Sequence, residues 1–469
     1  MISLTYFFLF IIIFDFFILY NNIEMSSVKL HEIEPVYYQQ NQRVEFRLQP
    51  DKLYSTDVIV ANVGISKAAN QTQVHKWTGV AGLITRCTLF DGNTELSKID
   101  DVGFWNGWKQ LTKGNQYCTS VAPYLNGSNQ AHQYNNTDGR TLQTLTAPLL
   151  ARGMNIEAAI ARDPLTNTTE LNTLRGQVRL RQIFDLLLSV PYIDTSVFKN
   201  FRIVCELSNV ANRVLKAQQT TTDLNTTRPL LVLHEIIDED VISGMMGKMG
   251  NVMYNEIEND SVFIPAITGM TNANRYVSQE QNYHINAFDN KTLGRMLLWK
   301  QPLLSTNVQD TLSGGSQVGN GIFSSSGFLG EQEQIRINGR NVYARSGING
   351  SNRRLAHTVD TWGNYSLAPF KNGLPYYEVD ALSRQNILDN GNGDVGTRDW
   401  VAVDLANEKC MDLQIDFRRR GLYVTDDGAG GDGGVALSKH NAAHNLQIWC
   451  EVKKAIVPMK NGGYNVVYI

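Results

Sequence analysis

Apolar and polar residues alternate along many short segments of this chain. The pattern occurs in Val44–Leu48, Val178–Leu180, Phe201–Leu207, Met411–Phe417 and Leu446–Val452. A period of two places successive side chains on opposite faces of a β-strand, one of which faces a core. Strands of this kind belong to antiparallel sheets that are buried on one side. The pattern therefore predicts an all-β protein built from antiparallel sandwiches.

Pairs of turn-forming residues separate the predicted strands. Asp91-Gly92, Asn338-Gly339 and Asn461-Gly462 can adopt the positive φ angles that tight hairpins need. Other connections are long, polar and rich in glycine, as in 305–328, 388–396 and 426–434. We expect loops there, because a rigid scaffold tolerates insertions at its loop tips.

Helical periodicity is scarce. Residues Val102–Leu111, which include Phe104, Trp105 and Trp108, predict a short helix, and Ile183–Leu188 predicts one or two further turns. No long amphipathic run occurs in the sequence, which argues against coiled coils and helix bundles.

Two faint sequence matches indicate an internal duplication. Phe201–Leu207 resembles Leu446–Val452, and the cysteines of these segments are 450 − 205 = 245 positions apart. Leu89–Asn93 resembles Arg336–Arg340, and the turn glycines are 339 − 92 = 247 positions apart. Each match is weak alone, because alternating strands look alike. The nearly equal offsets predict tandem copies of one domain, with residues 26–230 in the first copy and 231–469 in the second.

Length and charge narrow the protein class. A chain of 469 residues with 42% hydrophobic content is too long for one ordinary domain. The net charge of −3 gives no global basic field for wrapping nucleic acid and no acidic excess typical of disorder. Five cysteines are far apart and form no CxxC pair, which favours reduced, buried thiols: Cys87, Cys118, Cys205, Cys410 and Cys450.

The first 25 residues have a different character from the rest. Phe7–Tyr20 is apolar but interrupted by Asp15, and the first lysine is Lys29. The run lacks the basic region of a signal peptide and is short for a membrane-spanning helix. Two interpretations stay open: residues 1–25 form a leader, or translation begins at Met25. The N-glycosylation motif Asn-x-Ser/Thr occurs many times in the sequence, but we attribute most of these occurrences to chance, because the chain is rich in Asn and Thr.

The sequence holds few catalytic motifs. Gly244–Lys248 is followed by Met249, so it has neither the spacing nor the hydroxyl of a phosphate-binding loop, and GxSxG and HExxH motifs do not occur. His234-Glu235 begins like an HExxH motif but lacks the second histidine four residues after the first. His440 and His444 have the i,i+4 spacing of a helical metal pair, but no third ligand is nearby, and a loop is favoured.

Several charged clusters have both a functional and a plain interpretation. Asp238–Asp240, and the group Glu256, Glu258 and Asp260, offer paired carboxylates for glycoside hydrolysis but are more often solvated loop faces. A third set consists of Asp426, Asp427 and Asp432. This set offers oxygen ligands for calcium, although a flexible turn is favoured. We predict no catalytic, cofactor-binding or metal-binding residue.

Two further groups concern contacts rather than catalysis. Arg418–Arg420 is either a contact for nucleic acid or membrane, or a strand end that faces solvent. Aromatic side chains in turn-rich contexts are candidates for interface anchors, although we favour core packing. They are Trp77, Trp105, Trp108, Trp362 and Trp400.

Four stretches of this chain carry a resemblance to a known family. They are Leu180–Ile193 with the following Phe198–Asn209, Gly82–Ile99, Gln334–Tyr343 and Leu446–Ile469. They resemble the double jelly-roll major capsid proteins of tailless double-stranded DNA viruses, in particular Polinton-like viruses and virophages. Large algal DNA viruses and adenovirus hexons are more distant. The likeness covers most of residues 36–469 and is a pattern rather than a signature motif.

The resemblance implies a fold and a function. It implies two tandem eight-stranded jelly rolls with short helices and long loops, and homotrimers that form pseudo-hexagonal capsomers of an icosahedral shell. Neighbouring capsomers, penton and minor capsid proteins would be partners, with an internal membrane or the genome as further contacts. The protein would be a virion component without enzymatic activity or cofactor, made in the host cytoplasm or a virus factory. The alternative is a secreted β-sandwich that binds or cleaves glycans.

Overall fold

The computed structural model describes a chain dominated by antiparallel sheets. It describes residues 27–66, 79–111, 174–208, 225–269, 277–302, 332–344, 347–349, 351–362, 401–421, 423–424, 435–436, 443–459 and 463–469. The predicted all-β class is confirmed in this part of the chain, where the helices are short. Residues 1–25, the loops 305–328, 388–396 and 426–434, and the turn at Asn461-Gly462 lie outside the described residues.

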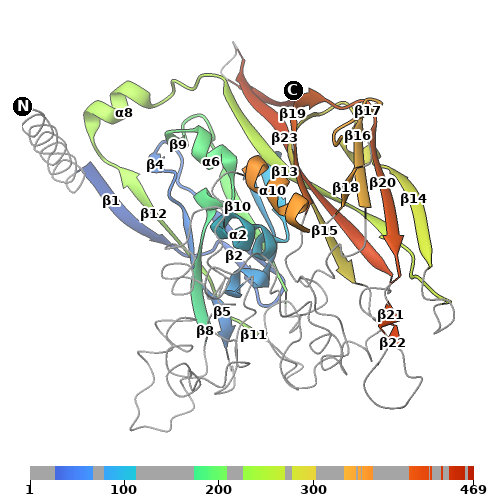
Figure 1. The fold of residues 1–469 in the computed structure, drawn as a ribbon. Coiled ribbons are helices and arrows are strands. Elements are labelled where there is room, and N and C mark those ends of the chain that lie inside the picture. Colours follow the sequence, from blue (N-terminus) through green and yellow to red (C-terminus); the bar gives the residue numbers. More distant parts are fainter. Residues whose placement is uncertain are drawn as a thin grey trace, which may run out of the picture.

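The first half of the chain forms two sheets (Figure 1, blue to green). Sheet I contains β1 (Val28–Ile33), β4 (Leu53–Ser55), β5 (Ile59–Ser66), β8 (Leu174–Arg179), β9 (Tyr192–Asp194), β11 (Asn225–Thr226) and β12 (Leu230–Ile236). Sheet II has the order β2-β3-β10-β6-β7, with β2 (Tyr37–Gln39), β3 (Arg43–Arg47), β10 (Phe201–Leu207), β6 (Ile84–Asp91) and β7 (Thr94–Asp100).

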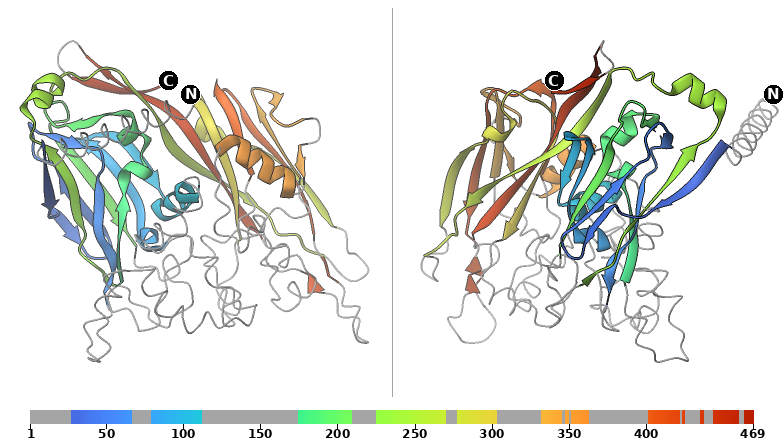
Figure 2. Two further views of the ribbon diagram at one scale, coloured as in Figure 1. Left: turned by 60° about the vertical axis from the view of Figure 1, so that its left-hand side comes forward. Right: turned by 180° about the vertical axis from the view of Figure 1, so that it is seen from behind.

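The second half forms two more sheets beside the first pair (Figure 2). Sheet III has the order β13-β23-β15-β19, with β24 also paired to β23: β13 (Val252–Ile264), β15 (Thr292–Pro302), β19 (Val401–Lys409), β23 (His444–Pro458) and β24 (Tyr464–Tyr468). Sheet IV has the order β14-β20-β16-β17, with β18 also paired to β16: β14 (Ser278–His284), β16 (Gln332–Ile337), β17 (Arg340–Asn341), β18 (Ile348–Asn349) and β20 (Leu413–Arg420). A small hairpin joins β21 (Tyr423–Val424) to β22 (Val435–Ala436).

Short helices connect the described strands. The α-helices are α2 (Val102–Leu111), α6 (Asp185–Ser189), α8 (Glu239–Met245) and α10 (Ser351–Trp362), and the 3₁₀ turns are η1 (Gly79–Leu83), η6 (Leu180–Gln182) and η7 (Asn286–Phe288). The predicted helix at Val102–Leu111 is confirmed with the same bounds. The turns predicted at Ile183–Leu188 correspond to α6. Helices α2 and α10 lie between the two halves (Figures 1 and 2).

The two halves share the same strand connectivity. In sheet I, β1 pairs with β12, and β12 pairs with both β4 and β5, which pair in turn with β9 and β8, respectively. In sheet III the order is β13-β23-β15-β19. In each of these sheets the first strand of the half pairs with a strand near its end, β12 in the first half and β23 in the second. Sheet II runs β3-β10-β6-β7, and sheet IV runs β14-β20-β16-β17. The same order of strands in both halves supports a duplication and makes β10 the counterpart of β20, and β12 the counterpart of β23.

This order corrects one of the two sequence matches. The match of Phe201–Leu207 to Leu446–Val452 is wrong, because the first segment is β10 in sheet II and the second lies in β23 of sheet III. Its true counterpart is β20, which includes most of Met411–Phe417. Strand β12 pairs with β1, β4 and β5, so residues 231–236 belong to the sheets of the first half, although the predicted division at 230/231 assigns them to the second.

The other match, between the two tight turns, agrees with the structure. The Asp91 carboxylate accepts a hydrogen bond from the Asn200 backbone N–H at 2.7 Å, just before β10 begins. The Asn338 amide oxygen accepts hydrogen bonds from the backbone N–H groups of Met411 and Asp412 at 2.8 and 3.3 Å, just before β20 begins. The same side-chain-to-backbone contact therefore fixes the start of the equivalent strand in both halves.

Two clusters of buried side chains form the interior. One fills the space between sheets III and IV and includes Phe288, Ile335, Ile415 and Ile448. The other fills the space between sheets I and II, and it continues into the second half through Trp362, Trp449 and other residues. The two halves are therefore joined by an apolar core and not only by a linker.

Candidate functional site at the junction of the two halves

An aromatic cluster forms the centre of the junction. Trp449 of β23 stacks on Phe104 and Trp105 of α2, with ring centroids 5.2 and 5.9 Å apart. Trp362, at the end of α10, makes edge contacts with Trp105 and Trp108 at 5.8 and 5.6 Å. Aromatic pairs of this kind contribute about 0.5–1.5 kcal/mol each beyond the burial of their area. The cluster therefore binds the helix of the first half to sheet III of the second.

The strand pattern explains why Trp449 faces the junction. Its neighbours Ile448 and Cys450 point into the core between sheets III and IV. Successive side chains of a strand point to opposite faces, so Trp449 points outward from that sandwich. It is nevertheless only 2% exposed, because α2 covers it. Sheet III is therefore covered on both faces along β23.

Cations surround the edge of the aromatic cluster. The Arg295 guanidinium lies 4.1 Å from the Trp362 ring centroid and donates hydrogen bonds to both carboxylate oxygens of Glu451, at 2.7 and 2.5 Å. The Lys109 ammonium lies 5.3 and 5.6 Å from the centroids of Trp105 and Trp362. A cation over an aromatic face is attracted by the ring quadrupole. These contacts fix the orientation of the indole rings.

Helix α2 also requires a very close backbone approach. A Cβ atom added to Gly103 would lie 2.6 Å from the Cα of Gly82 in η1. Real Cβ atoms do not approach backbone atoms so closely. Glycine at position 103 therefore allows α2 to lie against η1, which places the aromatic side chains of the helix toward sheet III.

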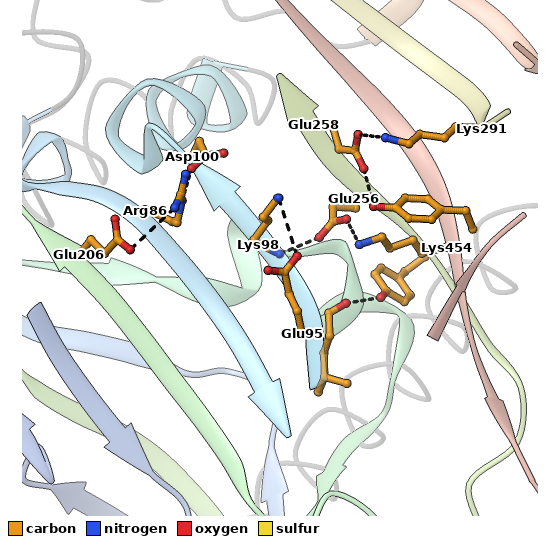
Figure 3. A network of polar contacts seen from close by, with 12 residues as sticks. Arg86, Glu95, Lys98, Asp100, Glu206, Glu256, Glu258, Lys291 and Lys454 are labelled. Atoms are coloured by element: carbon orange, nitrogen blue, oxygen red, sulfur yellow. Dashed lines mark hydrogen bonds and ion pairs between the residues drawn. The ribbon is translucent and has the colours of Figure 1, made fainter. Parts of the chain in front are cut away.

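A buried ion pair of the second half lies at the junction, and one of its members is hydrogen-bonded to the first half (Figure 3). Glu256 of β13 forms an ion pair with Lys454 of β23, and its other oxygen accepts a hydrogen bond from the backbone N–H of Lys98 in β7 at 2.7 Å. Burial raises the pKa of Glu256, while Lys454 and the Lys98 N–H act in the opposite direction. The Tyr254 hydroxyl donates to the Leu96 carbonyl, a second link from β13 to β7.

The last strand fastens the two halves together. The Tyr464 hydroxyl of β24 donates to the Asp91 carboxylate at 2.7 Å, and its ring packs on Phe198 at 5.2 Å. At the other end of β24, the Tyr468 hydroxyl donates to Glu258 at 2.8 Å. Burial, followed by the bond to Asp91, raises the pKa of Tyr464, so the phenol stays protonated and able to donate. Strand β24 thus contacts both the second half and the Asp91-Gly92 turn of the first half.

The acidic clusters have structural partners. Asp238 is the N-cap of α8 and accepts from the N–H groups of Asp240 and Val241 at 3.0 and 3.3 Å. Glu256 has the ion pair described above, and Glu258 pairs with Lys291 at 2.6 Å. Asp238 is thus held by backbone N–H groups, and Glu256 and Glu258 are each held by a lysine. Asp426, Asp427 and Asp432 lie outside the described residues.

The basic and histidine candidates are also held by internal contacts. Arg419 is 1% exposed, and it donates to the Pro265 carbonyl at 2.7 Å and lies 3.2 Å from Nδ1 of His444. Arg418 is exposed and pairs with Glu280 at 2.9 Å. His444 begins strand β23, so the helical pair with His440 is not formed by this residue, and His440 lies outside the described residues. No group of three or more metal-ligating side chains occurs in the part of the chain that the structure describes.

Glu235, which follows His234 on β12, contacts two basic side chains in sheet I. Its carboxylate forms ion pairs with His31 and Lys52, each at 2.5 Å. Burial raises the pKa of Glu235, but the hydrogen bonds and charges of Lys52 and His31 outweigh burial, so the net pKa is lowered. This contact joins β1, β12 and the segment before β4.

The predicted core packing of tryptophans is confirmed where the structure describes them. Trp105, Trp108 and Trp362 are 1%, 0% and 7% exposed. Trp77 and Trp400 lie outside the described residues. The sequence reasoning missed Trp449, although a signal was present, because a tryptophan on the polar face of an alternating strand indicates that this face is also covered.

Comparison with known proteins identifies the fold. No family model matches the sequence, and no curated protein matches it. Among solved structures, VP54 of PBCV-1 fitted into a reconstruction of the virophage Sputnik has a TM-score of 0.54 at 11% identity, covering 94% of this chain and 97% of that one. The Sputnik virophage structure gives a TM-score of 0.53 at 9% identity, covering 94% and 88%.

A third structure agrees with these two. The mavirus major capsid protein matches with a TM-score of 0.51 at 7% identity, and the match covers 94% of this chain and 90% of that one. The likeness extends over both halves and agrees with the repeated strand order described above. The chain therefore has the double jelly-roll fold found in these viral capsid structures.

Proposed function

We propose that this protein is a major capsid protein, whose function is to assemble with copies of itself into the shell of an icosahedral DNA virus. The observation that carries the proposal is the fold itself, two jelly rolls locked side by side into one rigid block. A shell subunit needs rigid walls and large lateral surfaces. The junction supplies the rigidity, because it is crossed by an aromatic cluster, by the hydrogen bond from the Lys98 N–H to the buried Glu256, and by contacts of the last strand.

We further propose that each half is one jelly-roll domain. The strand pairing supports a first domain of residues 26–236 and a second of 237–469, with α8 in the connection. Two similar domains in one chain allow three chains to form a ring of six similar units. Closed rings are the usual outcome of a head-to-tail contact between identical subunits when the rotation closes.

The internal repeat suggests which surface binds the next copy. In the second half, the outer face of sheet III is covered by α2 of the first half. The equivalent face of sheet I carries Val28, Leu30, Val232 and His234, which alternate along β1 and β12 with residues of the core face such as Leu231. Leu30 is 55% exposed. We propose that the second half of a neighbouring copy covers this face.

A shell subunit would have other capsid proteins as partners and the virion as its final location. Neighbouring capsomers, penton proteins and minor capsid proteins would contact the outer surfaces of the trimer, and the mature location would be the virion capsid. Assembly in the host cytoplasm or a virus factory is consistent with the free thiols among the described residues. The role is structural rather than catalytic, and no described feature favours the glycan-binding alternative.

A pair of surface variants tests the proposed contact. Leu30→Asp places a charge on the outer face of sheet I, and Tyr37→Asp places one on β2, at the edge of sheet II opposite β7. Both side chains are about half exposed, at 55% and 48%, so neither change should unfold the chain. We expect Leu30→Asp to dissociate the assembly and Tyr37→Asp to leave it intact, as measured by light scattering. An assembly that stays intact with Leu30→Asp would refute the proposal that a neighbouring copy covers the outer face of sheet I.

A further inference from the structure

Two cysteines lie directly opposite each other inside the first half. Cys87 of β6 is the register partner of Cys205 of β10, and their sulfur atoms are 3.5 Å apart. Directly opposite residues of antiparallel strands have Cα atoms about 4.5–5.5 Å apart. Disulfides span Cα distances of about 4.4–6.8 Å. The backbone is therefore already placed for a cross-link, and only small side-chain rotations separate the two sulfurs from bonding distance.

The surroundings of the two thiols keep them unreactive in the closed sheet. Both side chains are fully buried, and β10 has β3 on its other side. The hydrogen bond with Cys205, together with burial, raises the pKa of the Cys87 thiol. The thiolate is the reactive form of cysteine, so a raised pKa and exclusion of solvent both slow oxidation. The pair is thus close enough to bond but protected while the strands remain closed.

No other role for the pair is supported in the described residues. The neighbours Leu89 and Ile203 are apolar core residues, and no described cluster of three metal ligands includes either cysteine. The remaining described cysteines, Cys410 and Cys450, are buried in the core of the second half. In sheet III, Cys450 lies opposite Met296 and Glu258 rather than opposite a cysteine.

We propose that Cys87 and Cys205 are a latent disulfide, which forms when the chain meets a peroxide during local opening of the β6–β10 pair. In the first step, one cysteine loses its proton, and the thiolate attacks hydrogen peroxide and breaks the O–O bond, which yields a sulfenic acid and a hydroxide that takes up the lost proton to become water. In the second step, the other thiol displaces the hydroxyl group as water and forms the sulfur–sulfur bond. Overall, two thiols and one peroxide give one disulfide and two molecules of water.

The position of the bond determines its effect. It would close a chain segment of 205 − 87 = 118 positions, which includes α2 and the long insertion before β8. A disulfide across a long loop stabilises mainly by restricting the unfolded chain. The bond would also hold two neighbouring strands of sheet II in register. A reducing cell interior would keep the pair as thiols, and an oxidising environment outside the cell would permit the bond.

Mass spectrometry of the full-length protein tests this inference. The purified chain is treated with hydrogen peroxide in a urea concentration below the unfolding transition, and free thiols are then alkylated in full denaturant. We expect a product lighter by two hydrogen atoms, with one cross-linked tryptic species that joins Cys87–Lys98 to Ile203–Arg213. Cys410 and Cys450 are expected to be recovered in alkylated form. We also expect the melting temperature of the oxidised protein to rise by about 5 °C, reversed by a reducing agent.

Three variants provide controls. Cys87→Ala and Cys205→Ala should each abolish the cross-linked species, whereas Cys410→Ala should leave it unchanged. Peptide mapping of the wild-type chain gives a readout that does not depend on whether any variant folds. Recovery of both Cys87 and Cys205 in alkylated form after treatment, or their bonding to other cysteines, would overturn the inference. A melting temperature that falls on oxidation would also overturn it, because the bond would then be strained.

Discussion

Replacing Trp449 with alanine should weaken the connection between the two halves more than it weakens either half. The side chain is 2% exposed and stacks on Phe104 and Trp105 of the other half. Truncation of a buried tryptophan costs about 3–5 kcal/mol. Two lost aromatic contacts contribute about 1–3 kcal/mol of this cost. Because these contacts cross the junction, the loss should appear as separate unfolding of the two halves.

Ile448→Ala is the matched control for this change. Ile448 is the preceding residue on the same strand, is 0% exposed, and points into the core of the second half. Its truncation should cost about 2–5 kcal/mol, a comparable amount, without removing a contact with α2. The two variants therefore differ mainly in the face of β23 that they perturb.

Calorimetry and hydrogen exchange distinguish the two outcomes. For Trp449→Ala we expect the thermal transition to split in two, and amide exchange in Val102–Leu111 to accelerate. For Ile448→Ala we expect accelerated exchange in sheets III and IV, with little change in that helix. Equal exchange of the helix in the two variants would refute the proposal that Trp449 couples the halves.

Three further changes test other contacts. Arg354→Met leaves the fully buried Glu333 without its ion-pair partner, so urea unfolding should show a loss of about 3–5 kcal/mol, and Glu333→Gln in the same chain should recover part of it. Gly103→Ala forces α2 away from Gly82 and should lower the melting temperature, whereas a neutral result would contradict the close approach. Glu235 has a lowered pKa, so its stabilising effect is present above about pH 4.5 and is lost as the pH falls further. Glu235→Gln should therefore flatten the acid limb of stability measured by urea titration at a series of pH values.

The sequence predicted local structure well where periodicity and position agree. Phe104, Trp105 and Trp108 fall on a helical repeat, and the helix has the predicted bounds. Alternation in Phe201–Leu207 predicted a strand with the same bounds. Asn338 and its following glycine predicted a turn, and Asn338 has a φ of 51°. These features depend on neighbouring residues, which a single sequence displays directly.

The pairing of strands that are far apart in the sequence could not be predicted, because local patterns do not encode the register between two strands. Glu256 meets Lys454 because β13 and β23 pair over thirteen positions, and no local pattern reveals that register. From the sequence alone, the carboxylate was therefore a candidate for catalysis or for a solvated face. The cysteine match between Phe201–Leu207 and β23 failed for a related reason, because alternating strands of different sheets have similar sequences. Strand order, which identifies true counterparts, is visible only in the folded chain.

The mass of the purified full-length chain in solution, measured by light scattering on a sizing column and followed by electron microscopy, tests the central claim most directly. A capsid protein of this fold should form a stable particle of three times the 52.6 kDa of one chain, with threefold symmetry in averaged images. A monomer that stays monomeric at high protein concentration would contradict the proposed function.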